Sequence, residues 1–358
     1  MAKSKGTDPV SRARPFLIPI ALACAGMLLA GCATTAADGS APAAESAQPA
    51  QAAIERDPAV IDRLGQMSAY LRSLKSFQVT SQTTVDEVLE SGRKVQFGGT
   101  VGHRYVAPDK LHTFVRTDRL WRDFYYDGKT LTQVAPQMNY YASVPLAGSV
   151  ASLFGTLSRD YGVELPLADL FTWGTAEDGI DRVSSATLVG PASIDGTDCD
   201  HFALRRGGVD WQVWVQRGAQ PLPRKLVMTA TDVPQQPQYT AQLNWFTAIR
   251  PRAREFTYAP ARGAIRIIQV PTVKPQPPAA SADANANRHR RAVAPAAAAK
   301  AKATAPASTP VIGSVTRTLP PACVPVQMSG VVYQQCRGSY YQPQYVGTMV
   351  QYLVVSPP

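Results

Sequence analysis

The amino-acid sequence predicts an α+β domain made of one helix, about six antiparallel strands, a helical insert and five further strands. Three observations predict it. The hydrophobic period changes from helical to two after residue 75, turn signals separate runs of strand length, and 45% of the 358 residues are hydrophobic. That share is enough for a sizeable core, and one core with extra segments fits this length better than two full domains.

The first 31 residues have the properties of an export signal. Lys3–Arg14 is positively charged, and the apolar run Phe16–Leu29 is too short to span a bilayer well. The run ends in Leu29-Ala30-Gly31-Cys32, which resembles the lipobox of bacterial lipoproteins. The resemblance implies that residues 1–31 are a lipoprotein signal peptide and that Cys32 carries acyl chains such as palmitate. The alternatives are an ordinary signal peptide with an incidental Cys, or an uncleaved anchor.

Three buried acyl chains would attach the protein stably to a membrane. Ala33, rather than Asp, follows Cys32, which resembles the signals that sort lipoproteins outward. We therefore expect a location on the periplasmic face of the outer membrane, rather than at the inner membrane.

The mature chain begins with a tether and a helix. Residues 32–53 contain almost no large apolar side chain, which predicts a flexible tether. Asp57 and Pro58 are typical of a helix start. Apolar residues then recur at steps of four and three, which predicts an amphipathic helix that ends near Lys75; they are Val60, Leu64, Met67, Leu71 and Leu74.

Strands follow the helix in two groups. Alternating apolar and polar residues, with turn signals such as Ser91-Gly92, predict six strands between residues 76 and 144. Residues 149–161 return to helical spacing, and a second short helix is predicted near Pro166. Five strands then follow: 183–189, 199–205, 209–216, 222–230 and 239–246.

The C-terminal part divides into a linker and a small unit. Residues 271–312 are rich in Ala and Pro with scattered cations, which predicts a disordered basic linker. Its cations are either solvated or in contact with an anionic lipid or envelope polymer. Residues 313–358 are Tyr-rich and predict a small β-hairpin unit. In an exported protein Cys323 and Cys336 can close a disulfide that stabilises such a small unit by roughly 3 kcal/mol.

The positive charge lies outside the predicted domain. The formal net charge is +10, of which residues 1–31 carry +3 and residues 271–358 carry +7. Residues 32–270 are therefore neutral. Because this domain carries no net charge, we expect no basic groove for nucleic acid on it.

Several segments together resemble a known family: PLADLF (166–171), DRVSSATLVGPASIDGTDCDHFAL (181–204), VDWQVWV (209–215), PLPRKLV (221–227) and PQYTAQL (237–243). Over residues 54–270 they resemble the family of predicted periplasmic proteins known as domain of unknown function 2092. That family is similar to the carrier and receptor proteins for outer-membrane lipoproteins. The resemblance implies an unclosed antiparallel β-barrel of about eleven strands with helices covering its concave face. It also implies binding of an apolar ligand, such as a lipid acyl chain or a lipoprotein anchor.

An apolar concave face must be buried under the protein's own helices or around a lipid tail. Each inward-facing residue can therefore serve core packing or ligand contact, and strand alternation does not say which face is concave. The candidate ligand-binding residues are Phe77, Val79, Val85, Leu153, Phe154, Leu157, Trp211, Val213, Leu226, Met228, Leu243 and Trp245.

The sequence offers little catalytic chemistry. Cys199 and His201 are the one pair that suggests a thiol nucleophile, but on a strand they stand roughly 6–7 Å apart, too far for a hydrogen bond. Pairing of Cys199 with Cys323 or Cys336 would leave the other tail thiol unpaired. We expect no enzyme activity, metal or cofactor. Binding of an apolar ligand is the first hypothesis, a non-enzymatic envelope interaction or sensing module the second, and a thiol enzyme or hydrolase the third.

Overall fold

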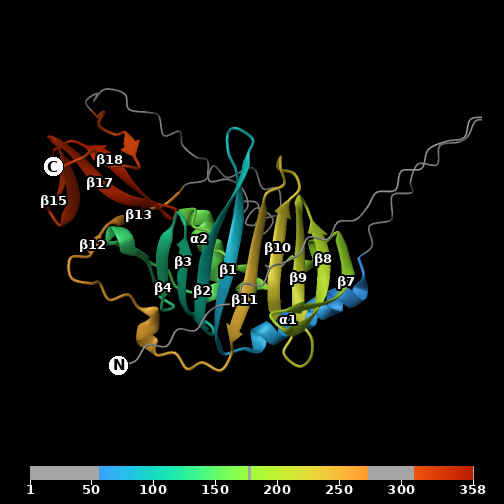
Figure 1. Cartoon of the computed structure of the whole chain (residues 1–358). Coiled ribbons are helices and arrows are strands. Elements are labelled where there is room, and N and C mark those ends of the chain that lie inside the picture. Colours follow the sequence, from blue (N-terminus) through green and yellow to red (C-terminus); the bar gives the residue numbers. More distant parts are fainter. Residues whose placement is uncertain (1–55, 176–178, 273–309, 358) are drawn as a thin grey trace, which may run out of the picture. The chain divides into compact units, whose positions relative to one another are not determined.

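The computed structural model describes residues 56–175, 179–272 and 310–357. Within these ranges, twelve strands form one open sheet in the order β12-β6-β5-β4-β3-β2-β1-β11-β10-β9-β8-β7 (Figure 1). Eleven of them pair antiparallel, the number that the sequence predicts. The twelfth is the short β12 (Ile265–Arg266), which pairs in parallel with β6. The edge strands β12 and β7 do not pair with each other, so the barrel is unclosed, as predicted.

The large sheet consists of two meanders that meet where β1 pairs with β11. The first meander precedes the helical insert and contains β1 (Ser76–Val88), β2 (Lys94–Val106), β3 (Lys110–Thr117), β4 (Trp121–Tyr126), β5 (Thr130–Ala135) and β6 (Tyr140–Pro145). The second follows the insert and contains β7 (Ser185–Ile194), β8 (Thr197–Arg206), β9 (Val209–Gln216), β10 (Pro223–Ala230) and β11 (Gln238–Phe246). Residues distant in sequence thereby share one apolar face.

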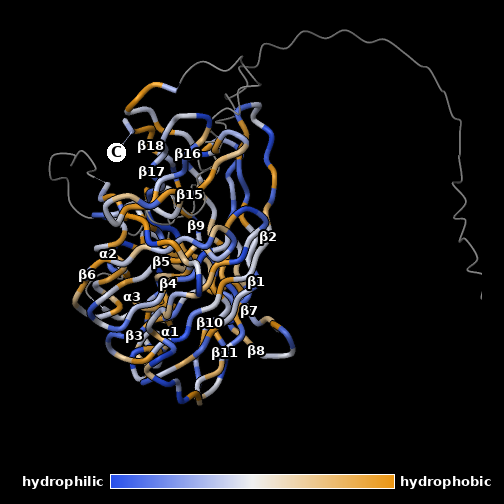
Figure 2. Tube along the Cα trace, turned by 90° about the vertical axis from the view of Figure 1, so that its left-hand side faces the viewer, coloured by the Kyte–Doolittle hydropathy of each residue, from blue (hydrophilic) through white to orange (hydrophobic). Residues whose placement is uncertain are grey.

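One face of this sheet is apolar because side chains of a strand alternate between its two sides. On β1, Phe77 and Val79 are fully buried, while Gln78 between them is partly exposed. Val79 lies opposite His103 of β2 and Trp245 of β11. The same alternation of hydrophobic and hydrophilic residues can be followed along the strands in Figure 2. We call this apolar side the concave face.

Three helices bury their apolar sides against the concave face. The first is α1 (Pro58–Ser73), where the Asp57 carboxylate accepts a hydrogen bond from the Ala59 amide. The second is α2 (Val150–Tyr161), which ends at Gly162 with a left-handed φ of 63°. The third is the short α3 (Asp169–Thr172). Their buried residues and the inward strand residues form one hydrophobic core, so the predicted covering of the concave face by helices is confirmed.

In the described part of the chain, three short 3-10 helices lie in the connections. They are η1 (Pro136–Met138), η2 (Ile180–Arg182) and η3 (Ala253–Phe256). The last of these packs beside β3 and β4, and its Glu255 pairs with Arg104 of β2.

The C-terminal residues form a second, smaller sheet. Its strands are β14 (Val315–Thr316), β15 (Cys323–Met328), β16 (Val331–Cys336), β17 (Ser339–Val346) and β18 (Met349–Val355). They are ordered β14-β18-β17-β16-β15, and β13 (Ile268–Val270) adds to β17 in parallel. The unit therefore contains the predicted hairpin, formed by β15 and β16, together with further strands.

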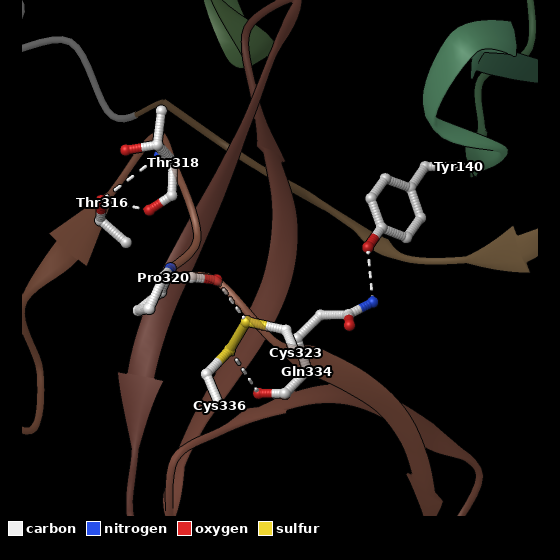
Figure 3. Close-up of a disulfide and its surroundings, with 7 residues drawn as sticks. All are labelled: Tyr140, Thr316, Thr318, Pro320, Cys323, Gln334 and Cys336. Atoms are coloured by element: carbon white, nitrogen blue, oxygen red, sulfur yellow. Dashed lines mark hydrogen bonds between the residues drawn. A yellow bond between two sulfur atoms is a disulfide. The ribbon is translucent and has the colours of Figure 1, made fainter.

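Cys323 and Cys336 form a disulfide between β15 and β16, where the two residues lie directly opposite each other (Figure 3). Beside it, the Gln334 side-chain amide donates to the hydroxyl of Tyr140 on β6, over 3.0 Å. Tyr140 also packs with Tyr345 in one buried cluster. The small sheet is thus stabilised by a covalent link and by contact with β6.

Several predicted segments lie outside the described residues. They are the signal peptide with Cys32, the tether, and residues 273–309 of the basic linker. In the part that the structure does describe, we find no helix both long enough and apolar enough to cross a membrane.

Candidate functional site

Aromatic side chains fill one part of the concave face. Phe77 of β1 packs against Phe171 of α3, with ring centroids 5.6 Å apart. Tyr105 and Trp245, on the strands to either side of β1, lie 5.1 and 5.2 Å from Phe77. Phe154 of α2 completes the cluster at 5.1 Å from Phe171. We call these five residues the aromatic cluster.

Farther along the same strands the side chains leave a cavity of about 220 Å³. It lies between the concave face and residues 164–169, which lead from α2 into α3 and which we call the covering segment. The covering segment supplies Glu164, Leu165, Pro166, Leu167, Ala168 and Asp169 to the lining. The sheet and its β3–β4 turn supply Thr83, Val85, Val101, Val115, Thr117, Leu120, Met228 and Tyr239. The lining is therefore mostly apolar.

The covering segment is held at both ends. At its start Glu164 accepts a hydrogen bond from the Ser158 hydroxyl of α2, over 2.5 Å. After its end, the Arg72 guanidinium of α1 donates to the carbonyl oxygens of Leu170, at 2.5 Å, and of Phe171. Between them Leu167 has a left-handed φ of 61°. This conformation costs a bulky residue on the order of 1–3 kcal/mol, so the segment stores some backbone strain over the cavity.

Most of the polar groups in the cavity wall have hydrogen-bond partners within the protein. The Thr83 hydroxyl donates to the Gly99 carbonyl at 3.2 Å, and the Thr117 hydroxyl accepts from the Leu120 amide at 2.9 Å. Tyr239 differs, because its hydroxyl is buried and has no hydrogen-bond partner among the described residues. Burial, and then the nearby Asp169 carboxylate, raise the pKa of Tyr239. Its hydroxyl therefore stays protonated and can donate.

A buried histidine lies beneath the start of α3. His103 is 1% exposed, its Nδ1 lies 2.9 Å from the Thr113 hydroxyl, and its ring contacts Phe171 edge-on. Burial lowers the pKa of His103 to about 4, although the Pro166 carbonyl acts in the opposite direction. The imidazole is therefore neutral at neutral pH and belongs to the wall of the core.

All twelve residues predicted to contact a ligand point into the concave core. Two of them, Val85 and Met228, line the cavity. The remaining ten pack against each other and the helices: Phe77, Val79, Leu153, Phe154, Leu157, Trp211, Val213, Leu226, Leu243 and Trp245.

Sequence reasoning missed most of the cavity wall. Thr83 continues the same alternation as Phe77 and Val79, so the pattern of β1 contained that signal. Tyr239 likewise starts an alternation along β11. The covering segment has no periodic pattern, and its residues alone do not indicate that it covers a cavity.

The Cys199–His201 pair lacks the geometry of a nucleophile and its base. The buried Cys199 thiol donates to the Thr197 carbonyl at 3.4 Å, and Cys199 packs with Trp214 and Val227 outside the concave core. The His201 ring stacks on Trp214, and its Nε2 lies 2.9 Å from the Gln212 side-chain oxygen. Burial raises the pKa of the Cys199 thiol and lowers that of His201. Both shifts disfavour a thiolate–imidazolium pair.

A second cavity, of about 390 Å³, lies between β6 and the small sheet. Its wall includes Ser143 and Val144 of β6, residues 266–269, residues 330–332 at the start of β16, and Gln342 and Pro343 of β17. It is larger than the cavity under the covering segment, but its wall comes from β6, residues 266–269 and the small sheet rather than from the concave face.

Comparison with known proteins gives a family and several similar structures. The sequence model of the family described as "Predicted periplasmic protein (DUF2092)" matches residues 61–269, more than half of the 358-residue chain. No curated protein matches the chain.

Three similar solved structures illustrate the range of matches. Lipoprotein LppX of Mycobacterium tuberculosis is 14% identical, with 54% of this chain and 98% of that chain covered, at a TM-score of 0.36. A LolA superfamily protein of Nitrosomonas europaea is 11% identical, with 56% and 97% covered, at 0.28. MucB, solved in complex with the periplasmic part of MucA, is 13% identical, with 82% and 92% covered, at 0.32.

Proposed function

The chain belongs to the DUF2092 family of predicted periplasmic proteins, and from that premise we propose that it is a non-enzymatic protein of the bacterial cell envelope that binds an apolar ligand, such as a lipid acyl chain, in its concave face. The ligand enters the cavity under the covering segment. The cavity itself is the observation that carries this proposal.

Protein cores are packed as tightly as organic crystals, with few voids larger than a water molecule. A cavity of about 220 Å³ lined mostly by apolar side chains is therefore unusual. An acyl chain in this cavity would make the apolar contacts that the lining side chains lack. Several of its lining side chains belong to the hydrophobic core of the concave face, which supports a space kept for a ligand.

The size of the cavity bears on how a ligand would fit. Ligand sites usually measure about 300–1,000 Å³, so the 220 Å³ cavity takes only part of a long chain while the covering segment is closed. The strained Leu167 lies in that segment, where a shift to an ordinary φ would relieve strain. We infer that the covering segment moves outward when a longer chain binds.

The membrane attachment is part of the same proposal. Acylation of Cys32 would hold the protein on the periplasmic face of the outer membrane, within reach of lipids and lipoprotein anchors. A Cys32→Ser variant should lose metabolic acyl labelling and leave the membrane fraction. A variant that stays labelled and membrane-bound would show that the anchor lies elsewhere.

Fluorescence titration tests the ligand site. The neutral dye N-phenyl-1-naphthylamine becomes fluorescent in apolar surroundings, and the purified wild-type chain should bind it. Val115→Phe places a larger side chain in the cavity, so it should abolish most of the signal. Val227→Phe enlarges a buried strand valine outside the concave core and serves as the matched control. Equal dye binding by both variants, or none by the wild type, would contradict the proposal.

A second candidate is an interaction or sensing module that uses the sheet as a scaffold. The packing of ten predicted ligand residues into the core favours it, as does the 390 Å³ cavity between β6 and the small sheet. The basic residues 273–309 would then contact an anionic envelope polymer. A wild-type chain that binds no apolar probe but cross-links to an envelope protein would establish this alternative.

A further inference from the structure

Tyr239 lines the cavity between two apolar neighbours. In the strand register Tyr239 is opposite Val85 of β1 on one side and Met228 of β10 on the other. All three side chains line the cavity. Tyr239 is 5% exposed, so its hydroxyl has no access to bulk water. Among the described residues this hydroxyl has no hydrogen-bond partner.

A buried tyrosine hydroxyl usually finds a partner, because an unpaired hydroxyl has lost its hydrogen bonds to water without replacing them. Phenylalanine would fill the same position without that cost. Tyr239 lines a cavity, so a partner for its hydroxyl can come from a ligand that enters there. The donor points to a ligand that brings a hydrogen-bond acceptor into apolar surroundings.

The charges around the cavity restrict the kind of acceptor. Asp169 and Glu164 both line it, and Asp169 is close enough to raise the pKa of Tyr239. Among the described lining residues there is no Lys, Arg or His that could balance a negative ligand. A carboxylate brought into this apolar space would face two acidic side chains and lose its hydration. An uncharged acceptor meets neither penalty.

Resting on the proposed function, we propose that the Tyr239 hydroxyl donates a hydrogen bond to the carbonyl oxygen of a neutral acyl ester, and that Asp169 and Glu164 select against free fatty-acid anions. The ligand class is therefore an esterified acyl chain, as in a glyceride. The chain itself occupies the apolar wall formed by residues such as Val101 and Val115.

Displacement of N-phenyl-1-naphthylamine from the full chain at pH 8 tests this assignment. Methyl palmitate should displace the dye from the wild type at least about tenfold more effectively than palmitate, the ratio that about 1.4 kcal/mol produces. Tyr239→Phe should weaken the displacement of the dye by methyl palmitate by about 2- to 13-fold, the range expected for one net hydrogen bond. It should leave displacement by hexadecane, which has no acceptor, unchanged.

Thr172→Val is the matched control. The Thr172 hydroxyl is also buried without a hydrogen-bond partner in the described structure, but Thr172 does not line the cavity. Removal of the Thr172 hydroxyl should not change the displacement of the dye by methyl palmitate or by hexadecane. The melting temperature without ligand supplies a second readout, because deleting an unpaired hydroxyl should not lower it in either variant.

The outcomes separate this inference from the proposed function. A wild type that binds no dye overturns both. Dye binding with equal ester affinity in wild type and Tyr239→Phe overturns only the role of Tyr239. Stronger displacement by palmitate than by its methyl ester overturns the selection against anions. A clear loss of thermal stability in ligand-free Tyr239→Phe would mean that the hydroxyl already has an internal partner.

Discussion

Two parts of one concave face differ in how completely they are filled. Around Phe77 the aromatic cluster closes the space between β1 and α3, with ring centroids 5.1 to 5.6 Å apart. Six to eight residues farther along β1, Thr83 and Val85 line a cavity of about 220 Å³. Both parts lie on the same strand and follow the same alternation of inward and outward residues.

The difference comes from what covers each part. Helices α2 and α3 bring Phe154 and Phe171, which fill the first part. The covering segment brings smaller or more polar residues, among them Ala168 and Asp169, to the second part. The comparison teaches that a ligand site in this fold is decided by the segment that covers the sheet rather than by the sheet.

The largest expected effect tests the filled part. Phe77→Ala removes the ring at the centre of the aromatic cluster, where its surroundings cannot collapse easily. We expect a loss of about 3–5 kcal/mol in the free energy of unfolding, measured by urea denaturation. A loss below about 1 kcal/mol would mean that this part of the face is as loosely filled as the cavity.

The dependence of the unfolding free energy on pH tests the region between the two parts of the concave face, where His103 is buried. The pKa of His103 is about 4 in the folded protein, whereas in the unfolded chain it should be about 6.5. Below pH 6.5 the unfolded state therefore binds more protons, and stability falls as the pH drops towards 4. The loss attributable to His103 is about 3 kcal/mol by pH 4, and urea denaturation at a series of pH values measures it.

The control for this prediction is His103→Gln, which keeps a polar side chain but does not titrate. Its unfolding free energy should depend less steeply on pH between 6.5 and 4 than that of the wild type. Parallel pH profiles for the two proteins would show that His103 is not the titrating group.

The smallest expected effect lies outside both parts. Cys199→Ala removes a buried thiol from the cluster with Trp214 and Val227. We expect a loss of only about 1 kcal/mol and no change in binding of N-phenyl-1-naphthylamine. Loss of a biological activity in this stable variant would instead support the thiol-enzyme hypothesis.

The fold was largely predictable because its signals are local. The period of two along β1 and the Asp57-Pro58 helix start each depend on neighbouring residues. Eleven strands and the helical insert followed from such patterns. The short β12 was missed because two residues, Ile265 and Arg266, are too few to show a period.

The cavity was not predictable in the same way, because it depends on contacts distant in sequence. Leu167 lines the same cavity as Val101 and Met228, which come from strands on opposite sides of the insert in the sequence. Alternation placed Val213 and Leu243 on one face of their strands, but it does not distinguish a filled position from an open one. That distinction required the path of the covering segment.

Native mass spectrometry of the full chain, extracted from cell membranes in mild detergent, tests the central claim most directly. The intact mass should exceed the denatured mass by that of a non-covalently bound lipid with an esterified acyl chain. The excess should disappear in Val115→Phe, which fills the cavity, and persist in Val227→Phe. Equal native and denatured masses for the wild type, or full retention of the lipid by Val115→Phe, would contradict the account.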